Sequence, residues 1–174
     1  MLRRRLGNRS EGQTGHRYQM REKLIAFGDD FYIQNELGAR VFFVDGKMLR
    51  VRHTLLFKDM QGHELLKIQE KFLHVRDTMS IERNGQVVAH VHSALISPLR
   101  DRYKIDIPGG ADMLAQGNFL QHEYDIKQNG DTIAEVSKKW FRVADTYGVE
   151  IDRGQDAILI LAITVCIDAM SHPD

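Results

Sequence analysis

One pattern of fourteen residues recurs three times and limits what this chain can fold into. Each copy has a basic residue, an apolar pair, a second basic residue and a valine, and Asp-Thr or His-Thr follows one residue later. The copies are GKMLRVRHTLLFKD (46–59), EKFLHVRDTMSIER (70–83) and KKWFRVADTYGVEI (138–151). A shift of 24 residues aligns the first copy with the second, and a shift of 68 aligns the second with the third. Such repeats indicate one supersecondary unit that is used several times.

Within and beyond these copies, apolar residues alternate with polar ones, which is the period of a strand and not of a helix. The apolar pairs are Phe31/Ile33, Leu55/Phe57, Met79/Ile81, Tyr103/Ile105, Tyr124/Ile126 and Tyr147/Val149, with Phe42/Val44, Leu66/Ile68, Ala89/Val91 and Ala134/Val136 in the partner strands. Turn signals separate the runs: NELG (35–38), DMQG (59–62), RNG (83–85), PGG (108–110) and QNG (128–130). We therefore expect hairpins whose strands each have one buried and one largely wet face.

A first strand near residues 23–27 and a degenerate strand near 113–119 bring the expected number to about twelve. Antiparallel strands with one apolar face are expected to close, because closure removes the exposed edges of the sheet. The sequence thus predicts a mainly β protein with a closed barrel. Side chains fill a barrel of about eight strands, so a twelve-stranded one needs an additional apolar filling.

The run AILILAITVCI (157–167) near the C-terminus can supply this filling. It is apolar on every side except at Thr164, and Asp156 precedes it as a helix cap. Its Ile, Val and Thr residues favour strands locally. Eleven continuous apolar residues are nevertheless long for a strand, and a helix that is apolar all round belongs in a core. We expect a buried central helix of roughly 14 residues, with Asp168 at its exit.

The first 21 residues differ in composition from the rest of the chain. They hold six arginines against a single acidic residue, so the remainder of this formally neutral protein is mildly acidic. Residues 1–19 are predicted to be a disordered basic tail, and residues 20–172 a single barrel domain. The tail lacks the apolar stretch of a signal peptide. It is either a functional basic arm or a segment that precedes a true start at Met20.

Two groups of residues invite a chemical interpretation. His90 and His92 have the spacing of one strand face, which metals can use, but no Cys, Asp or Glu completes a ligand set, so a surface pair is expected. A two-residue RNG loop would turn both histidines inward, and a three-residue loop with a bulge would turn them outward; the phase of the repeat favours outward. Four acidic residues recur at one position of the repeat and are interpreted as corners, not catalytic carboxylates: Asp29, Asp30, Asp77 and Asp145. No catalytic or metal-binding residue is predicted.

The single cysteine, Cys166, excludes an internal disulfide and suits a reducing compartment. Its place within the apolar run favours packing over reactivity. Basic residues of the repeat are the candidates for a lipid-phosphate site: Lys47, Lys71, Lys138, Lys139 and Arg142. The alternative is that these side chains are solvated and cover apolar surface with their stems.

Several motifs closely resemble the LURP-one-related family: FGDDFYI (27–33), VDGK (44–47), VSKKWF (136–141), DTYGVEI (145–151) and DAILILAI (156–163). The resemblance extends from about Tyr18 to Ile167 and implies the tubby-like barrel, in which twelve strands surround a C-terminal helix. Relatives include the phosphoinositide-binding tubby proteins and the phospholipid scramblases. The resemblance implies the fold more firmly than an activity, because one fold hosts many functions.

The function predicted is that of a non-catalytic binding or regulatory module in the cytoplasm. Its partner would be an anionic phospholipid membrane, to which it binds peripherally, or another protein. No cofactor and no transmembrane span are expected. Nucleic acid is not expected either, since the acidic body does not suit binding to phosphate backbones. The alternative is a scramblase-like lipid-handling protein, which would require the apolar helix to leave the barrel, although eleven residues are too few to span a bilayer. An enzyme is a third class.

Overall fold

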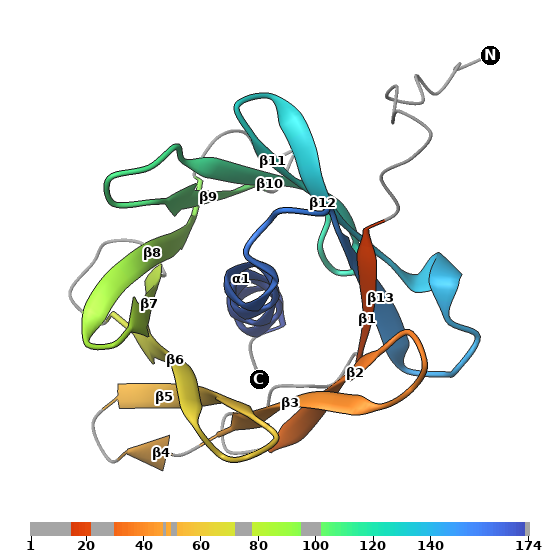
Figure 1. Ribbon diagram of the computed structural model, residues 1–174. Helices are drawn as coiled ribbons and strands as arrows, with labels where there is room; N and C mark the ends of the chain where they lie inside the picture. The colour runs from red at the N-terminus through yellow and green to blue at the C-terminus, as the bar shows by residue number, and fades with distance from the viewer. Residues whose placement is uncertain are drawn as a thin grey trace.

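Twelve antiparallel strands close into a barrel around a single C-terminal helix (Figure 1). The computed structural model describes residues 15–21, 30–46, 48–49, 52–71, 78–94 and 102–172. Within them the strands are β1 (His16–Arg21), β2 (Phe31–Asn35), β3 (Arg40–Asp45), β4 (Met48–Leu49), β5 (Arg52–Asp59), β6 (Glu64–Glu70), β7 (Thr78–Arg83), β8 (Gln86–Ser93), β9 (Arg102–Asp106), β10 (Met113–Asn118), β11 (Glu123–Gln128), β12 (Asp131–Ser137) and β13 (Thr146–Ile151). A 3-10 helix, η1 (Lys138–Trp140), precedes β13, and α1 is Ala157–Ser171.

Each strand of the ring pairs with its neighbour in the chain, except that β3 pairs with β5 and β1 pairs with β13. Among the residues that the structure describes, the short β4 pairs with the start of β5 alone. The predicted fold class, a closed barrel of about twelve strands around a buried helix, is therefore confirmed. The degenerate strand expected near 113–119 is β10.

The predicted inner face is also confirmed. All twelve residues of the six leading apolar pairs are buried, from Phe31 and Ile33 to Tyr147 and Val149. The outer face is less wet than expected at two positions, Ser80 and Glu150, which are buried as well. Glu150 is covered because Arg17 on the adjacent strand β1 bonds to its carboxylate.

The repeated unit is a hairpin with a bulge in its second strand. In four hairpins the register shifts by one residue, leaving one apolar residue of the second strand unpaired: Val41, Leu65, Val88 and Ile133. A bulge bends its strand and increases the local twist. Four bulges at equivalent positions therefore help the sheet to curve into a closed ring.

The bulge at Val88 also decides which way His90 and His92 face. The turn between β7 and β8 has two residues, Asn84 and Gly85, both with positive φ. The expectation that such a loop turns the histidines inward is wrong, because the bulge places Ile81 opposite Ala89. Ala89 is buried on the inner face, so both histidines face outward, as the repeat phase favoured.

Helix α1 fills the barrel along its length (Figure 1). Asp156 caps it by accepting a hydrogen bond from the Leu159 N–H at 3.1 Å, as predicted. Every residue from Leu159 to Ala169 is buried. The Thr164 hydroxyl donates to the Ile160 carbonyl at 3.0 Å, so the one polar side chain in the apolar run is satisfied. Burial on all sides thus overrides the local strand preference of Ile and Val.

Within the described ranges, no helix combines the length and the apolar character that crossing a membrane demands.

The boundary of the N-terminal tail needs a correction. Strand β1 begins at His16 and pairs with β13 along its whole length, so residues 16–19 belong to the barrel and not to the tail predicted at 1–19. Tyr18 packs against Phe42, and Met20 is buried in the core. These contacts hold the strand in place. The strand expected at 23–27 lies outside the described residues, as do Asp29 and Asp77 of the expected corners.

Candidate functional site

The two ends of the barrel have different connections. Because neighbouring strands are antiparallel, the turns β2–β3, β5–β6, β7–β8, β9–β10 and β11–β12 lie at one end, here called the hairpin end. The connections β6–β7, β8–β9, β10–β11 and β12–β13 lie at the other end. Helix α1 follows β13 from the hairpin end and finishes at this second end, here called the exit end.

The described basic residues of the predicted lipid site all belong to the exit end, but they do not form one cluster. Lys138, Lys139 and Arg142 lie together in the β12–β13 connection, whereas Lys71 follows β6 on the far side of the ring. Lys47 lies outside the described residues. Half of the ring separates Lys71 from the other three, so they cannot bind one lipid headgroup together.

Lys138 and Lys139 are in the 3-10 helix η1 and not in a strand. The Ser137 hydroxyl caps this helix by accepting from the Lys139 N–H at 3.2 Å. The Glu123 carboxylate accepts from the Ser137 hydroxyl at 2.9 Å and from the Lys138 N–H at 3.0 Å. These bonds, two of them to Glu123 on the neighbouring strand β11, end strand β12 and turn the chain at the rim.

The β12–β13 connection is seated firmly on the outside of the barrel. The rings of Trp140 and Phe141 lie directly over Gly148 of β13, where a Cβ atom would come within 2.8 Å of either ring. The Arg17 guanidinium stacks over the Trp140 ring at 5.0 Å from its centroid. The aromatic residues are therefore anchored, and the residues that follow them project into solvent.

Exposed basic and apolar side chains lie on this connection and on the β10–β11 turn of the same end. Val143 is 61% exposed and Leu120 is 64% exposed. Lys139 and Arg142 are exposed on the same connection as Val143, and the Lys139 ammonium lies 3.6 Å from the carboxylate of Glu123, which begins β11 after the turn that carries Leu120. These four residues, Leu120, Lys139, Arg142 and Val143, are called the rim patch below.

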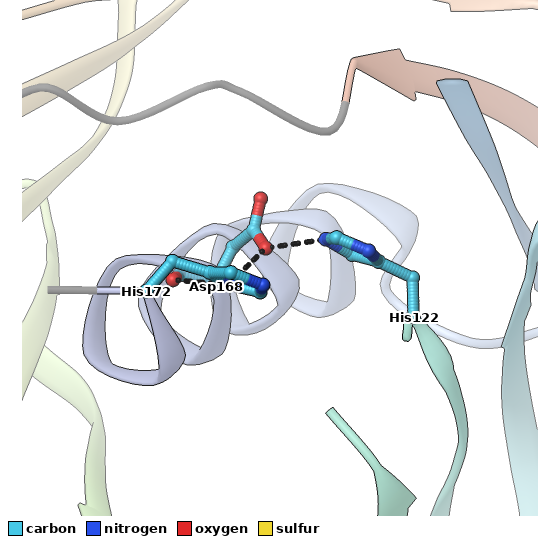
Figure 2. A group of neighbouring side chains, drawn as sticks. All are labelled: His122, Asp168 and His172. Carbon is cyan, nitrogen blue, oxygen red and sulfur yellow. Dashed lines mark hydrogen bonds and ion pairs between the residues drawn. The ribbon is translucent and has the colours of Figure 1, made fainter. Parts of the chain in front are cut away.

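A buried polar cluster lies at the same end, around the last turn of α1 (Figure 2). The Asp168 carboxylate oxygen Oδ1 lies 2.7 Å from His122 Nε2 and 3.3 Å from His172 Nδ1. The side chains of His122 and Asp168 are only 3% and 4% exposed, whereas that of His172 is 35% exposed. The other carboxylate oxygen, Oδ2, accepts from the Tyr147 hydroxyl at 3.1 Å. One carboxylate thus gathers three side chains from three segments of the chain.

The imidazole of His122 is held in a fixed orientation. Its ring stacks on Tyr147 with centroids 4.2 Å apart, and it lies nearly parallel to the His172 ring at 5.0 Å. His122 adopts a φ of 50°, a left-handed conformation that costs energy for a residue with a side chain. Its Nδ1 atom is buried and has no hydrogen-bond partner among the described residues. Buried ring nitrogens are normally paired, so this one requires an explanation.

Tyrosines of the repeat line the interior around this cluster. Tyr103, Tyr124 and Tyr147 are each the second residue of their strand, and the Tyr103 hydroxyl bonds to Ser171 at 3.0 Å. Burial, and secondarily the negative charge of Asp168, raise the pKa of Tyr124. Burial likewise raises the pKa of the Cys166 thiol, which favours the predicted packing role over a reactive one. The polar end of the interior is therefore built from neutral hydroxyls around one carboxylate.

Sequence reasoning missed this cluster. Asp168 was expected only to mark the exit of the helix, and neither His122 nor His172 was singled out. One signal was available, because Asp168 and His172 are four residues apart and so share a helix face. His122 is 46 residues away from Asp168 in the sequence and reaches it only when the barrel closes.

Comparisons with known proteins agree on the fold. The sequence model of the LURP-one-related family matches residues 16–168. The chain is similar to the uncharacterised protein YxjI of Bacillus subtilis, with 23% identity over 155 residues, which cover 89% of this chain and 93% of the relative. Its fold resembles the X-ray structure of a protein from Arabidopsis thaliana, with a TM-score of 0.65 and 13% identity over 92% of this chain and 94% of the other.

Proposed function

The chain belongs to the LURP-one-related family, and from that premise we propose that it is a non-catalytic module that binds anionic phospholipid membranes peripherally. The rim patch at the exit end would contact the membrane. The observation that carries the proposal is that two basic and two apolar residues are exposed on the β12–β13 connection and the β10–β11 turn of the same end.

This combination suits the surface of a bilayer. Lys139 and Arg142 can approach lipid phosphates, and each basic residue near an anionic surface contributes about 1 kcal/mol. Leu120 and Val143 can enter the boundary between headgroups and acyl chains, where burial of apolar surface adds roughly 25 cal/mol per Å². Anionic lipids are concentrated in the cytoplasmic leaflet, so this proposal includes a location in the cytoplasm.

The rigid seat of the patch also supports the proposal. Trp140 and Phe141 pack on Gly148, so the patch keeps its shape before it meets a ligand. A preorganised surface loses little conformational entropy on binding.

A scramblase-like activity has less support. It would require α1 to leave the barrel for lipid, yet eleven consecutive residues of this helix are buried against the strands. Moving them out would expose the inner faces of all the strands. Reconstitution with fluorescent lipid separates the two functions, because a peripheral module leaves the distribution of lipid between the leaflets unchanged.

Liposome co-sedimentation tests the proposal. We expect the full chain to sediment with vesicles that contain phosphatidylserine and to stay in solution with neutral ones. Binding is expected to weaken steeply with salt, because charges beyond about 8 Å are screened at physiological ionic strength. The double variant Lys139→Glu/Arg142→Glu is expected to lose most of the binding. Its matched control is Arg40→Glu/Arg153→Glu, which reverses two exposed basic residues at the hairpin end.

The arginine-rich N-terminus can be tested in the same assay. A chain that starts at Met20 would lose four residues of β1 that pair with β13, so it would compromise the barrel. A chain that starts at Gly15 removes the arginines before β1 and keeps the strand.

Two outcomes would contradict these proposals. Equal loss of vesicle binding in both charge-reversal variants would refute the rim patch as the contact surface. No vesicle binding by the full chain at low salt would refute the lipid proposal.

A further inference from the structure

We propose that the exit end binds a divalent first-row transition-metal ion, such as Zn²⁺, through His122, Asp168 and His172. The sequence predicted no metal site, and the lipid proposal does not require one. The ligand atoms would be Nε2 of His122, Oδ1 of Asp168 and Nδ1 of His172, which converge at the end of α1 (Figure 2).

The chemistry of this donor set favours a transition ion over calcium or magnesium. Two imidazole nitrogens and one carboxylate are ligands that Zn²⁺ and its neighbours accept, whereas calcium and magnesium prefer a shell of oxygens. Three protein ligands leave a position open for water or a small ligand. The partly exposed His172 gives an ion a path from solvent to the cluster.

The spacing of the three atoms is close to that of a coordination shell. Ligands at about 2.0–2.1 Å from a tetrahedral zinc are about 3.3 Å from one another. His172 Nδ1 and Asp168 Oδ1 are already 3.3 Å apart. His122 Nε2 is closer, at 2.7 Å, because in the ion-free cluster it shares a hydrogen bond with the carboxylate. All three atoms lie within 4.8 Å of one another, so binding an ion would require both rings to adjust.

The surroundings support the ligands as they do in known metal sites. The Tyr147 hydroxyl bonds to Oδ2, which orients the carboxylate and leaves Oδ1 for the ion. The same tyrosine ring stacks on His122 and fixes its plane. Asp168 and His172 are four residues apart on one helix face, a spacing that brings two ligands to one ion.

An ion on Nε2 would leave the other ring nitrogen of His122 as it is in the ion-free cluster. Its Nδ1 atom has no partner among the described residues, although the ring is almost entirely buried. When an ion takes the lone pairs of His122 Nε2 and His172 Nδ1, each neutral ring carries its proton on its other nitrogen. A neutral ring whose proton lies on the ligating nitrogen moves that proton to its other nitrogen, whereas an imidazolium or a protonated carboxyl would release one proton to solvent.

The test is titration of the tag-free full chain with CoCl₂ and then with ZnCl₂, followed by absorption spectroscopy. We expect one Co²⁺ per chain, ligand-field bands of nitrogen and oxygen coordination, and displacement by Zn²⁺. His172→Gln leaves the His122–Asp168 bond in place and so should keep the fold, which a thermal melt checks. It is expected to weaken binding by at least about tenfold. Asp168→Asn is expected to abolish the bands.

The matched control is His90→Gln/His92→Gln, which removes the outward-facing strand pair and leaves the exit end unchanged. We expect this variant to bind Co²⁺ as the parent does. Loss of the bands in this control would assign the ion to the outer surface and overturn the proposal. Absence of stoichiometric binding in the parent chain would overturn the proposal as well, and so would full binding in a folded His172→Gln variant. The three residues would then form a hydrogen-bonded cluster that holds no ion.

Discussion

The two ends of the barrel are stabilised by hydrogen bonds that differ in how far apart the bonded residues are in the sequence. At the hairpin end, residues of a turn stabilise that same turn: Asn35 accepts from the backbone N–H groups of Leu37 and Ala39, and Asp59 does so from Gln61 and His63. At the exit end, His122 bonds to a carboxylate 46 residues away. Local bonds thus shape the first end, whereas the second exists only in the closed barrel. Both proposed binding sites lie at the exit end.

The largest expected effect comes from breaking the element that joins the two ends. Ile160→Asp places a charge in the middle of α1, where the parent side chain is fully buried. An unpaired charge there costs several kcal/mol, against a typical total stability of about 5–15 kcal/mol. We expect an insoluble or unfolded protein by circular dichroism.

The control for this change is Ala157→Asp, in the half-buried first turn of α1, where an acidic residue favours the helix N-terminus. It should melt close to the parent. If the Ile160→Asp protein also melts within a few degrees of the parent, α1 does not fill the barrel.

The next effect compares one aspartate at each end. Asp168→Ala would leave His122 and Tyr147 buried without their acceptor, and we expect a loss of about 3–5 kcal/mol, as for breaking a buried pair. Asp59→Ala removes bonds that face solvent and should cost about 1 kcal/mol. Urea unfolding with a chelator present measures both without a contribution from bound metal. Equal losses of stability would mean that the exit end depends no more on long-range contacts than the hairpin end does.

The same contrast explains what the sequence could and could not predict. Strand alternation is a local property, so all twelve leading apolar residues were placed correctly on the inner face. The Asp156 cap could likewise be predicted, because it depends only on residues that are close in the sequence. The combination of a two-residue turn with a bulge at Val88 was not anticipated, because the register depends on the partner strand. His122 reaches Asp168 only through closure of the ring, and the turn at Lys138 depends on Glu123 from another strand.

A smaller effect concerns the seat of the rim patch. Gly148→Ala would push a Cβ into the Trp140 and Phe141 rings, and overpacking of this kind costs about 1–3 kcal/mol. We expect the emission of Trp140, the single tryptophan, to shift to the red and binding to phosphatidylserine vesicles to weaken. At the hairpin end, Gly62→Ala meets no atom within 4 Å and is strained only by its positive φ. It should lower stability and leave the emission unchanged; a matching red shift there would contradict the seating of the loop.

The smallest effect concerns Asp156, the residue that caps α1 at the hairpin end. Burial tends to raise the pKa of Asp156, but the bonds from Arg83 and from the Leu159 N–H outweigh it and hold this pKa below its ordinary value. The folded chain therefore binds fewer protons here than the unfolded one. The stability from this group is present above about pH 4 and is lost as the pH falls through the folded-state pKa.

Because Asp156 is a half-buried helix cap, Asp156→Ala should cost only about 1 kcal/mol near neutral pH. Urea unfolding near neutral pH and at about pH 3 should show the parent losing part of this advantage over the variant as Asp156 begins to protonate. Asp156→Asn keeps an acceptor for Leu159 and should vary less with pH than the parent. A difference between parent and Asp156→Ala that grows towards acid would show that Arg83 does not favour the charged form.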